Sequence, residues 1–176
     1  KLRYLSENNR NIRRISLIRN IFPNSKILIT YRDPLQQSYS LLTQHQLFIQ
    51  KGHNDKFLSN YMKWIGHTEF GAHYSPIINE KLTYTDPLEI NHWLEQWSKI
   101  YSKFLNQKSV NQFYINYEKL CSDKNLWLAL QDILDLNCKF DYQFIKNFKD
   151  FSPNYDHLLL DKCNRIYEDL SNKSII

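Results

Sequence analysis

The chain has 176 residues, of which 42% are hydrophobic and 15% aromatic, so it can form one domain with a real core and is too apolar to be disordered. Its three glycines and five prolines argue against an all-β chain, and no apolar run approaches the roughly 20 residues of a transmembrane helix. The net charge is +5, with six cations and one acid in the first 20 residues. This excess favours an anionic partner (a nucleotide, a nucleic acid or a membrane surface), although a solvated helix face gives the same pattern.

Three widely spaced cysteines show neither a CxxC pair nor metal-ligand spacing. We therefore expect reduced thiols, no metal site and a cytoplasmic location. No signal peptide is visible in the polar N-terminal residues. The sequence begins with Lys1 rather than methionine, which favours a trimmed or processed piece of a longer product.

The first half of the chain alternates between helical and extended patterns. Asn8–Ile21 is predicted to be a helix, because its isoleucines recur at helical spacing with the arginines off that stripe. Lys26–Tyr31 is a short run rich in β-branched residues, typical of a strand buried on both faces in a parallel sheet. Asp33 suits a helix N-cap and Pro34 the first helical position. A helix is therefore predicted from there to about Gln50, where a nearby glycine ends it.

The rest of the chain is predicted to be mainly helical. Asp86–Glu89 has a capping residue, a proline at the first position and a glutamate three residues after the cap, which predicts a long helix to about Asn106. Gln112–Asn116 is predicted to be a second strand. Further helices are predicted at Asp55–Ile65, Leu126–Leu136, Gln143–Phe148 and Tyr155–Leu170.

Strands separated by helices imply a parallel sheet and the α/β class. Two strands cannot make an independent sheet of this kind. Further strands are therefore expected within residues 72–85 or 137–142, or upstream of the sequence.

Arg32 and Ser40 are the main candidate ligand-binding residues. Arg32 follows the first strand at its carboxyl end, where open α/β sheets bind ligands, and the next helix directs its N-terminus to the same place. Ser40 lies about two turns into that helix. A phosphate held by Arg32 could also accept a hydrogen bond from Ser40. The alternative is that Arg32 pairs with Asp33 or another acid, and that Ser40 has no such role.

Two motifs resemble those of the sulfotransferases, which transfer a sulfuryl group from 3′-phosphoadenosine-5′-phosphosulfate (PAPS) to a hydroxyl or amine. Residues 22–34, Phe-Pro-Asn-Ser-Lys-Ile-Leu-Ile-Thr-Tyr-Arg-Asp-Pro, followed by Ser40, resemble the family's second cofactor motif. There the arginine and the serine eight residues later bind the 3′-phosphate, which implies that role for Arg32 and Ser40. Phe113–Leu120 is similar to the family's strand ending in Tyr-Glu-Asp-Leu, which implies that Tyr117 lies against the adenosine. Lys119 replaces the family's aspartate.

The resemblance implies a partial sulfotransferase-like domain over residues 1–176. Its fold would be the parallel sheet of sulfotransferases and P-loop nucleoside-triphosphate hydrolases, flanked by helices, without the N-terminal strand and phosphosulfate loop. No glycine-rich loop of that kind occurs here, and the usual catalytic base also precedes the second motif. The chain alone is therefore expected to bind PAPS, or its product 3′-phosphoadenosine-5′-phosphate (PAP), without turnover.

The catalytic residues and the acceptor cannot be assigned from the sequence. His67 and Glu69, in a loop bounded by glycines, are candidates for acceptor binding or proton transfer, and the alternative is that they clamp the loop. A second interpretation of the whole chain is a non-catalytic remnant that binds a nucleotide or a protein. Nucleic-acid binding is less favoured, because aromatic residues are not interleaved with the N-terminal arginines. The open side of the Ile27–Ile29 strand should be filled by an upstream segment, a second copy of the chain, or a strand from residues 72–85.

Overall fold

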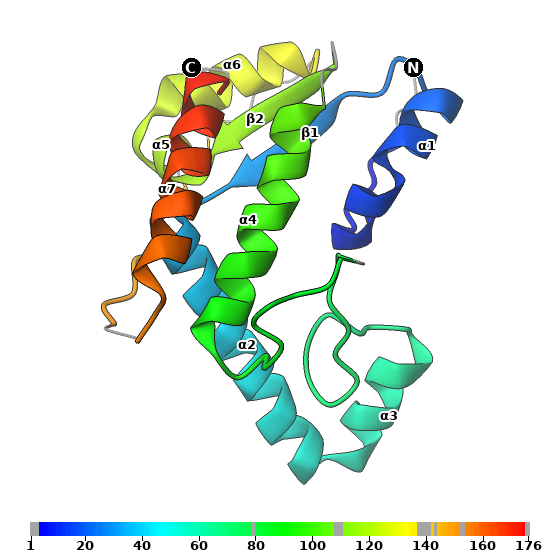
Figure 1. Cartoon of the computed structure of the whole chain (residues 1–176). Coiled ribbons are helices and arrows are strands. Elements are labelled where there is room, and N and C mark those ends of the chain that lie inside the picture. Colours follow the sequence, from blue (N-terminus) through cyan, green and yellow to red (C-terminus); the bar gives the residue numbers. More distant parts are fainter. Residues whose placement is uncertain are drawn as a thin grey trace.

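A parallel sheet of two strands lies at one end of the molecule, and two long helices extend away from it (Figure 1). The computed structural model describes residues 4–78, 80–107, 111–136, 142, 144–151 and 154–174. In chain order, the elements of this part are η1 (Asn9–Arg14, a 3-10 helix), α1 (Ile15–Ile21), β1 (Ile27–Tyr31), α2 (Pro34–Asn54), α3 (Lys56–Trp64), α4 (Ile90–Asn106), β2 (Gln112–Asn116), α5 (Tyr117–Ser122), α6 (Lys124–Ile133) and α7 (His157–Asn172).

The two strands pair in parallel, in a register that runs from Ile27 opposite Gln112 to Tyr31 opposite Asn116. Both strands lie within one residue of their predicted positions, and both carboxyl ends reach the same edge of the sheet. The predicted α/β class and the parallel pairing are therefore confirmed.

Helix α4 forms the centre of the hydrophobic core. Ten of its residues are buried, and they pack with residues of β1, β2, α2 and α7. The hydroxyl of Tyr101 donates to the carbonyl of Thr30 (2.8 Å) and the indole of Trp97 donates to Gln37 Oε1 (3.0 Å), so α4 is fixed to both β1 and α2. The apolar stripe predicted for this helix therefore lies in the hydrophobic core.

Strand β1 is covered more fully on one face than on the other. Ile29 and Tyr31 are buried against α4 and α7, whereas Leu28 is half-buried and Thr30 is exposed. The prediction of a strand buried on both faces is therefore wrong for the face that carries Thr30. On the same face, Ile115 of β2, which is paired with Thr30, is buried, so the exposure is limited to β1.

Several predicted helix boundaries differ from the structure, including those of α6 and α7, which differ by two or three residues at each end. The N-terminal helix begins as the 3-10 helix η1, capped by the Asn8 side chain, and only its second half is α-helical. Helix α2 continues through Gly52 to Asn54, because the next capping residue is Asp55. Helix α4 begins at Ile90 rather than at the proline after Asp86, since the Asp86 carboxylate accepts from the N–H of Leu88 and closes a separate turn.

Residues 144–148, predicted to be helical, are irregular in the structure. The carbonyls of Ile145 and Asn147 instead accept hydrogen bonds from the side chains of Tyr117, in α5, and Arg32, between β1 and α2, so tertiary contacts override the local pattern. The strand considered for residues 72–85 is absent from the described residues 72–78 and 80–85. For the range 137–142, residues 137–141 lie outside the described part of the chain.

The outer edge of β1 has no partner strand in the part of the chain that the structure describes. Strand β2 separates β1 from Ser174, which forms an isolated parallel bridge with Tyr114 on the far side. Unpaired strand edges bind additional strands readily. The expectation that an upstream segment or a second copy pairs with β1 therefore stays a prediction.

Amide exchange can test whether this edge is free in the purified chain. The N–H of Ile27 donates to Asn111 on the β2 side (2.8 Å), so alternation directs the N–H groups of Leu28 and Thr30 to the outer edge. We expect these two amides to exchange at least about tenfold faster than those of Ile29 and Tyr31, measured by NMR at low protein concentration. Equal protection of all four in a monomer, as checked by size-exclusion chromatography, would contradict a free edge.

Two buried histidines belong to a polar network beside α4. The His92 Nδ1 donates to the Tyr84 carbonyl (2.7 Å), since that oxygen can only accept, and Nε2 accepts from the Tyr74 hydroxyl (2.6 Å). The Nδ1 of His45 accepts from the N–H of Gly71 (3.2 Å). In each ring, one nitrogen accepts a hydrogen bond through its lone pair, and protonation of that nitrogen would break the hydrogen bond. Burial lowers the pKa of both side chains, and the nearby His92 lowers that of His45 further.

This network predicts a loss of stability in mild acid. An unfolded histidine binds a proton near pH 6.5, whereas His45 and His92 resist protonation in the fold, so the unfolded state binds more protons as the pH falls below that value. The free energy of unfolding should therefore have its full value above about pH 7. It should decrease toward pH 5.5, by at most about 1.4 kcal/mol per pH unit for each histidine. Urea titrations across this range would measure the slope.

The matched variants for this measurement are His92→Asn and His53→Asn, of which the second changes an exposed histidine. The first should be less stable at pH 7.5 but should show a flatter pH slope. The second should behave as the unchanged chain. An unchanged slope in His92→Asn would show that the ring does not stay neutral in the fold.

Candidate functional site

Arg32 and Tyr117 meet where the two strands end. Each follows the last residue of its strand, and those last residues are paired across the sheet. As a result, the Cζ atom of Arg32 lies 5.0 Å from the centre of the Tyr117 ring, a cation–π distance. Helix α2 begins at the same place, with the Asp33 carboxylate accepting from the N–H of Gln36 (2.8 Å). The structure thus brings together two of the three residues predicted to bind the cofactor.

The guanidinium of Arg32 is held mostly by groups of the chain itself. Its side chain is 17% exposed, and Nε lies 3.7 Å from Oε1 of Glu118. One terminal nitrogen donates to the carbonyl of Asn147 and lies 3.4 Å from Gln36 Oε1. Nε is buried and makes no hydrogen bond to any described residue. Arg32 is therefore paired with an acid, as one of the two interpretations predicted, and it still has an unused donor.

Glu118 is the acidic residue at this site that sequence reasoning missed. Its Oε1 accepts from the N–H of Asp33 (3.2 Å), at the N-terminus of α2, and its Oε2 accepts from the Tyr167 hydroxyl (3.2 Å). Burial raises the pKa of Tyr167 to about 12, so the phenol stays protonated and can donate. Asn116 in turn donates to the Tyr167 oxygen (2.9 Å). Glu118 follows Tyr117 in the motif at the end of the second strand. However, no rule of residue spacing predicts that it contacts Arg32.

Residues 144–151 lie across this end of the sheet. The Gln36 side chain donates to the carbonyl of Lys149 (2.9 Å) and accepts from its N–H (3.0 Å), and the Tyr117 hydroxyl donates to the carbonyl of Ile145 (3.0 Å). The Phe151 ring stacks on Tyr39 of α2, with centroids 3.7 Å apart. The segment also brings a further cation to α2, because Lys149 Nζ lies 5.7 Å from the centre of the Tyr39 ring. The sequence predicted a helix for residues 143–148, and it did not predict that this segment lies at the end of the sheet.

Ser40 is half-buried in the second turn of α2, about 9 Å along the helix from its first residue. Its hydroxyl makes no hydrogen bond to any of the described residues, and neither does the buried hydroxyl of Ser38. No direct bond joins Ser40 to Arg32. A shared anion between them stays a prediction.

His67 and Glu69 lie in a loop that packs near the other end of α2. The His67 ring stacks on Phe48 with centroids 5.8 Å apart, and Phe48 lies about 21 Å along α2 from its first residue. Glu69 Oε2 accepts from Asn9 of η1 (2.8 Å), and Arg10 donates to the Thr68 hydroxyl. Glu69 thus binds a side chain of η1 rather than the backbone, and none of these contacts brings the loop to Arg32.

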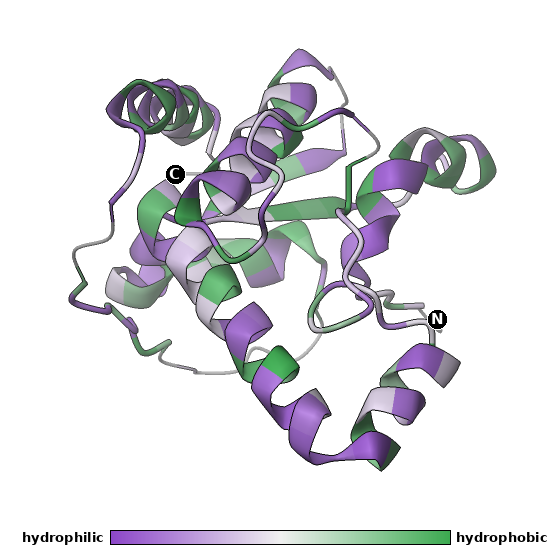
Figure 2. Cartoon of the chain, turned by 60° about the horizontal axis from the view of Figure 1, so that its bottom comes forward, coloured by the Kyte–Doolittle hydropathy of each residue, from purple (hydrophilic) through white to green (hydrophobic). Residues whose placement is uncertain are grey.

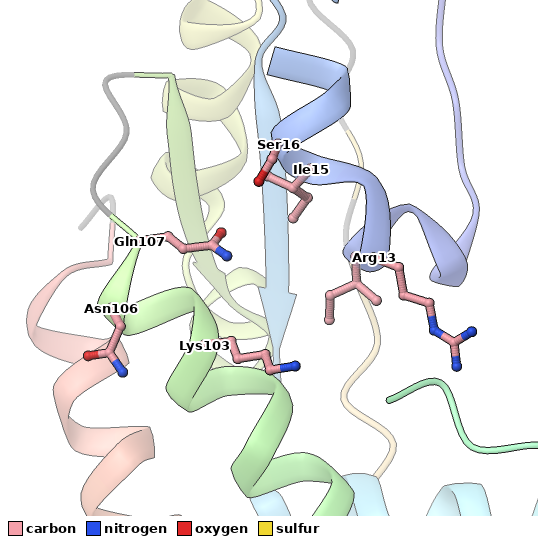
Figure 3. A pocket seen from close by; sticks show the side chains of 7 residues that line it. Arg13, Ile15, Ser16, Lys103, Asn106 and Gln107 are labelled. Carbon is pink, nitrogen blue, oxygen red and sulfur yellow. The ribbon is translucent and has the colours of Figure 1, made fainter. Parts of the chain in front are cut away.

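A cavity lies elsewhere, between η1 and α1 on one side and the end of α4 on the other. It has a volume of about 440 Å³ and is lined by Ile12, Arg13, Ile15, Ser16, Lys103, Asn106 and Gln107. Figure 3 shows Lys103 of α4 and Gln107, which follows the last residue of α4, extending toward the α1 side. Lys103 is paired with Glu80 (2.6 Å), and Arg13 donates to the backbone carbonyls of Pro76 and Ile77. Both cations already have partners, so the cavity does not resemble an anion site.

Comparisons with protein-family models, curated proteins and solved structures find no match. The described residues contain no group of three or more histidine, cysteine, aspartate or glutamate side chains that could hold a metal ion. Among those same residues, no helix is both long and apolar enough to cross a bilayer. The candidate site must therefore be interpreted from its own geometry.

Proposed function

We propose that the chain binds the 3′-phosphoadenosine end of PAPS and is the cofactor-binding part of a sulfotransferase. The observation that carries the proposal is the meeting of Arg32 and Tyr117 at the common carboxyl end of two parallel strands. Parallel α/β sheets bind nucleotides at this edge. The residues that meet there are two of the three that the resemblance to the sulfotransferase motifs indicates.

In this proposal, each side chain has a separate role. Arg32 would bind the 3′-phosphate through its guanidinium, whose Nε makes no hydrogen bond to any described residue, and the Ser40 hydroxyl would donate to the same group. The N-terminus of α2 adds a favourable dipole for the phosphate. Tyr117 offers a ring face to the adenine or ribose. Lys149, which lies over the Tyr39 ring of α2, increases the positive potential around an anion.

The contact between Arg32 and Glu118 favours a second candidate function, a non-catalytic remnant. A carboxylate near the guanidinium already satisfies part of its charge, as expected for an arginine whose role is structural. Such a chain would bind a protein partner, or a nucleotide without turnover. Binding of PAP, rather than catalysis, is therefore the first property to measure.

Isothermal titration calorimetry with PAP and with adenosine 5′-monophosphate tests the proposal, because the two ligands differ in the 3′-phosphate. PAP should bind at least about tenfold more tightly, since charge-assisted hydrogen bonds contribute about 1.5–3 kcal/mol. Arg32→Ala should remove this preference, and Ser40→Ala should weaken PAP binding by roughly fivefold.

The matched control is Arg165→Ala, which removes an exposed arginine on α7 and should leave PAP binding unchanged. Equal affinity of the unchanged chain for both ligands would contradict the proposal. A chain that binds neither ligand, but whose melting temperature falls in Arg32→Ala and not in Arg165→Ala, would favour the structural role of Arg32.

A further inference from the structure

Helix α3 exposes an aromatic stripe that no described residue covers. Phe57, Tyr61 and Trp64 recur at helical spacing, with Ile65 beside them, and these side chains are 69%, 45%, 72% and 54% exposed. The Phe57 and Tyr61 rings stack with centroids 6.2 Å apart. Four large apolar side chains in one stripe form a contiguous patch, which in soluble proteins indicates a contact surface.

The same helix is anchored to the protein through a different face. Leu58, Ser59 and Met62 are half-buried and line a small cavity together with Phe48 and Gly52 of α2. The aromatic stripe is therefore additional to the packing that holds α3 in place. Figures 1 and 2 both show α3 at the extremity of the molecule, far from the sheet.

The charges around the stripe are positive. Lys56 and Lys63 lie on the neighbouring stripe of α3, and Lys51 precedes them in the last turn of α2; all three are exposed. The single acid of the range 51–65 is Asp55, whose carboxylate caps α3 by accepting from the N–H of Leu58 (3.0 Å). The surface thus combines tryptophan, tyrosine and phenylalanine with lysine, the composition of helices that lie in the interfacial region of a bilayer.

We infer that α3 docks the protein onto a membrane surface that carries anionic phospholipids. The aromatic stripe inserts among the headgroups, and Lys51, Lys56 and Lys63 contact the phosphates. A second copy of the chain fits this surface less well, because a two-fold contact through α3 would bring its lysines together. This inference uses no residue of the candidate cofactor site.

Vesicle co-sedimentation of the whole chain tests the inference. The protein should bind vesicles of phosphatidylcholine mixed with phosphatidylglycerol and should bind pure phosphatidylcholine weakly, and high salt should release it. Binding should also shift tryptophan emission to the blue. Trp64 is the strongly exposed tryptophan, whereas Trp93 and Trp97 are buried and Trp127 is half-buried. Trp64→Phe should therefore lose the shift while keeping most of the binding.

Two pairs of variants separate the stripe from general surface effects. Phe57→Ser combined with Trp64→Ser should weaken vesicle binding about tenfold or more, whereas Leu158→Ser, at a side chain 80% exposed on α7, should not. Lys56→Glu combined with Lys63→Glu should abolish the preference for anionic vesicles, whereas Lys162→Glu on α7 should preserve it. Circular dichroism melts would confirm that each variant is folded.

Several results would overturn the inference. One is that the unchanged chain does not bind anionic vesicles, and another is that the double serine variant binds them as well as the unchanged chain. A third is a concentration-dependent dimer, seen by analytical ultracentrifugation, that the double serine variant abolishes. That result would assign the stripe to contact between copies of the chain.

Discussion

The burial of one helix, α4, is the constraint on which the rest of the fold depends. Its inward side chains contact the sheet, α2 and α7, so these elements reach a common core only while α4 lies between them. The helix also carries polar groups into that core. Glu95 accepts from the N–H groups of Thr83 and Tyr84 (2.8 Å each) and pairs with Lys99 (3.1 Å). A single helix thereby fixes the position of β1, the direction of α2 and the course of the preceding loop.

The candidate site shows how a short sheet can collect charged groups from distant segments. Arg32, Glu118 and the backbone of residues 145–149 come from three parts of the chain and converge at one end of two strands. The convergence balances a cation with an acid in partly buried surroundings, where an unpaired charge would be costly. Any anion that binds to Arg32 must therefore share it with Glu118. The electrostatics of the site depend on that competition as much as on the arginine.

Much of the local structure could be predicted from the sequence, because local causes determine it. The β-branched run of β1, the Asp33 cap with Pro34, and the apolar periodicity of α4 each gave an element of the correct type in the correct place. Long-range contacts explain the failures. Residues 144–148 bond to Tyr117 and Arg32 instead of forming a helix, and the Asp86 turn delays the start of α4. Similarly, Arg32 and Tyr117 were predicted individually, but the pairing with Glu118 required the register of the strands.

The parallel pairing of β1 with β2 also has a consequence for the order of folding. The two strands come from opposite halves of the chain, and the connection between them includes α2, α3, the loop after α3 and α4. Closing such a long connection costs chain entropy before any ladder bond can form. Contacts of high sequence separation therefore form late, and the helices that connect the strands should assemble first. The juxtaposition of Arg32 and Tyr117 would then be among the last native features to appear during refolding.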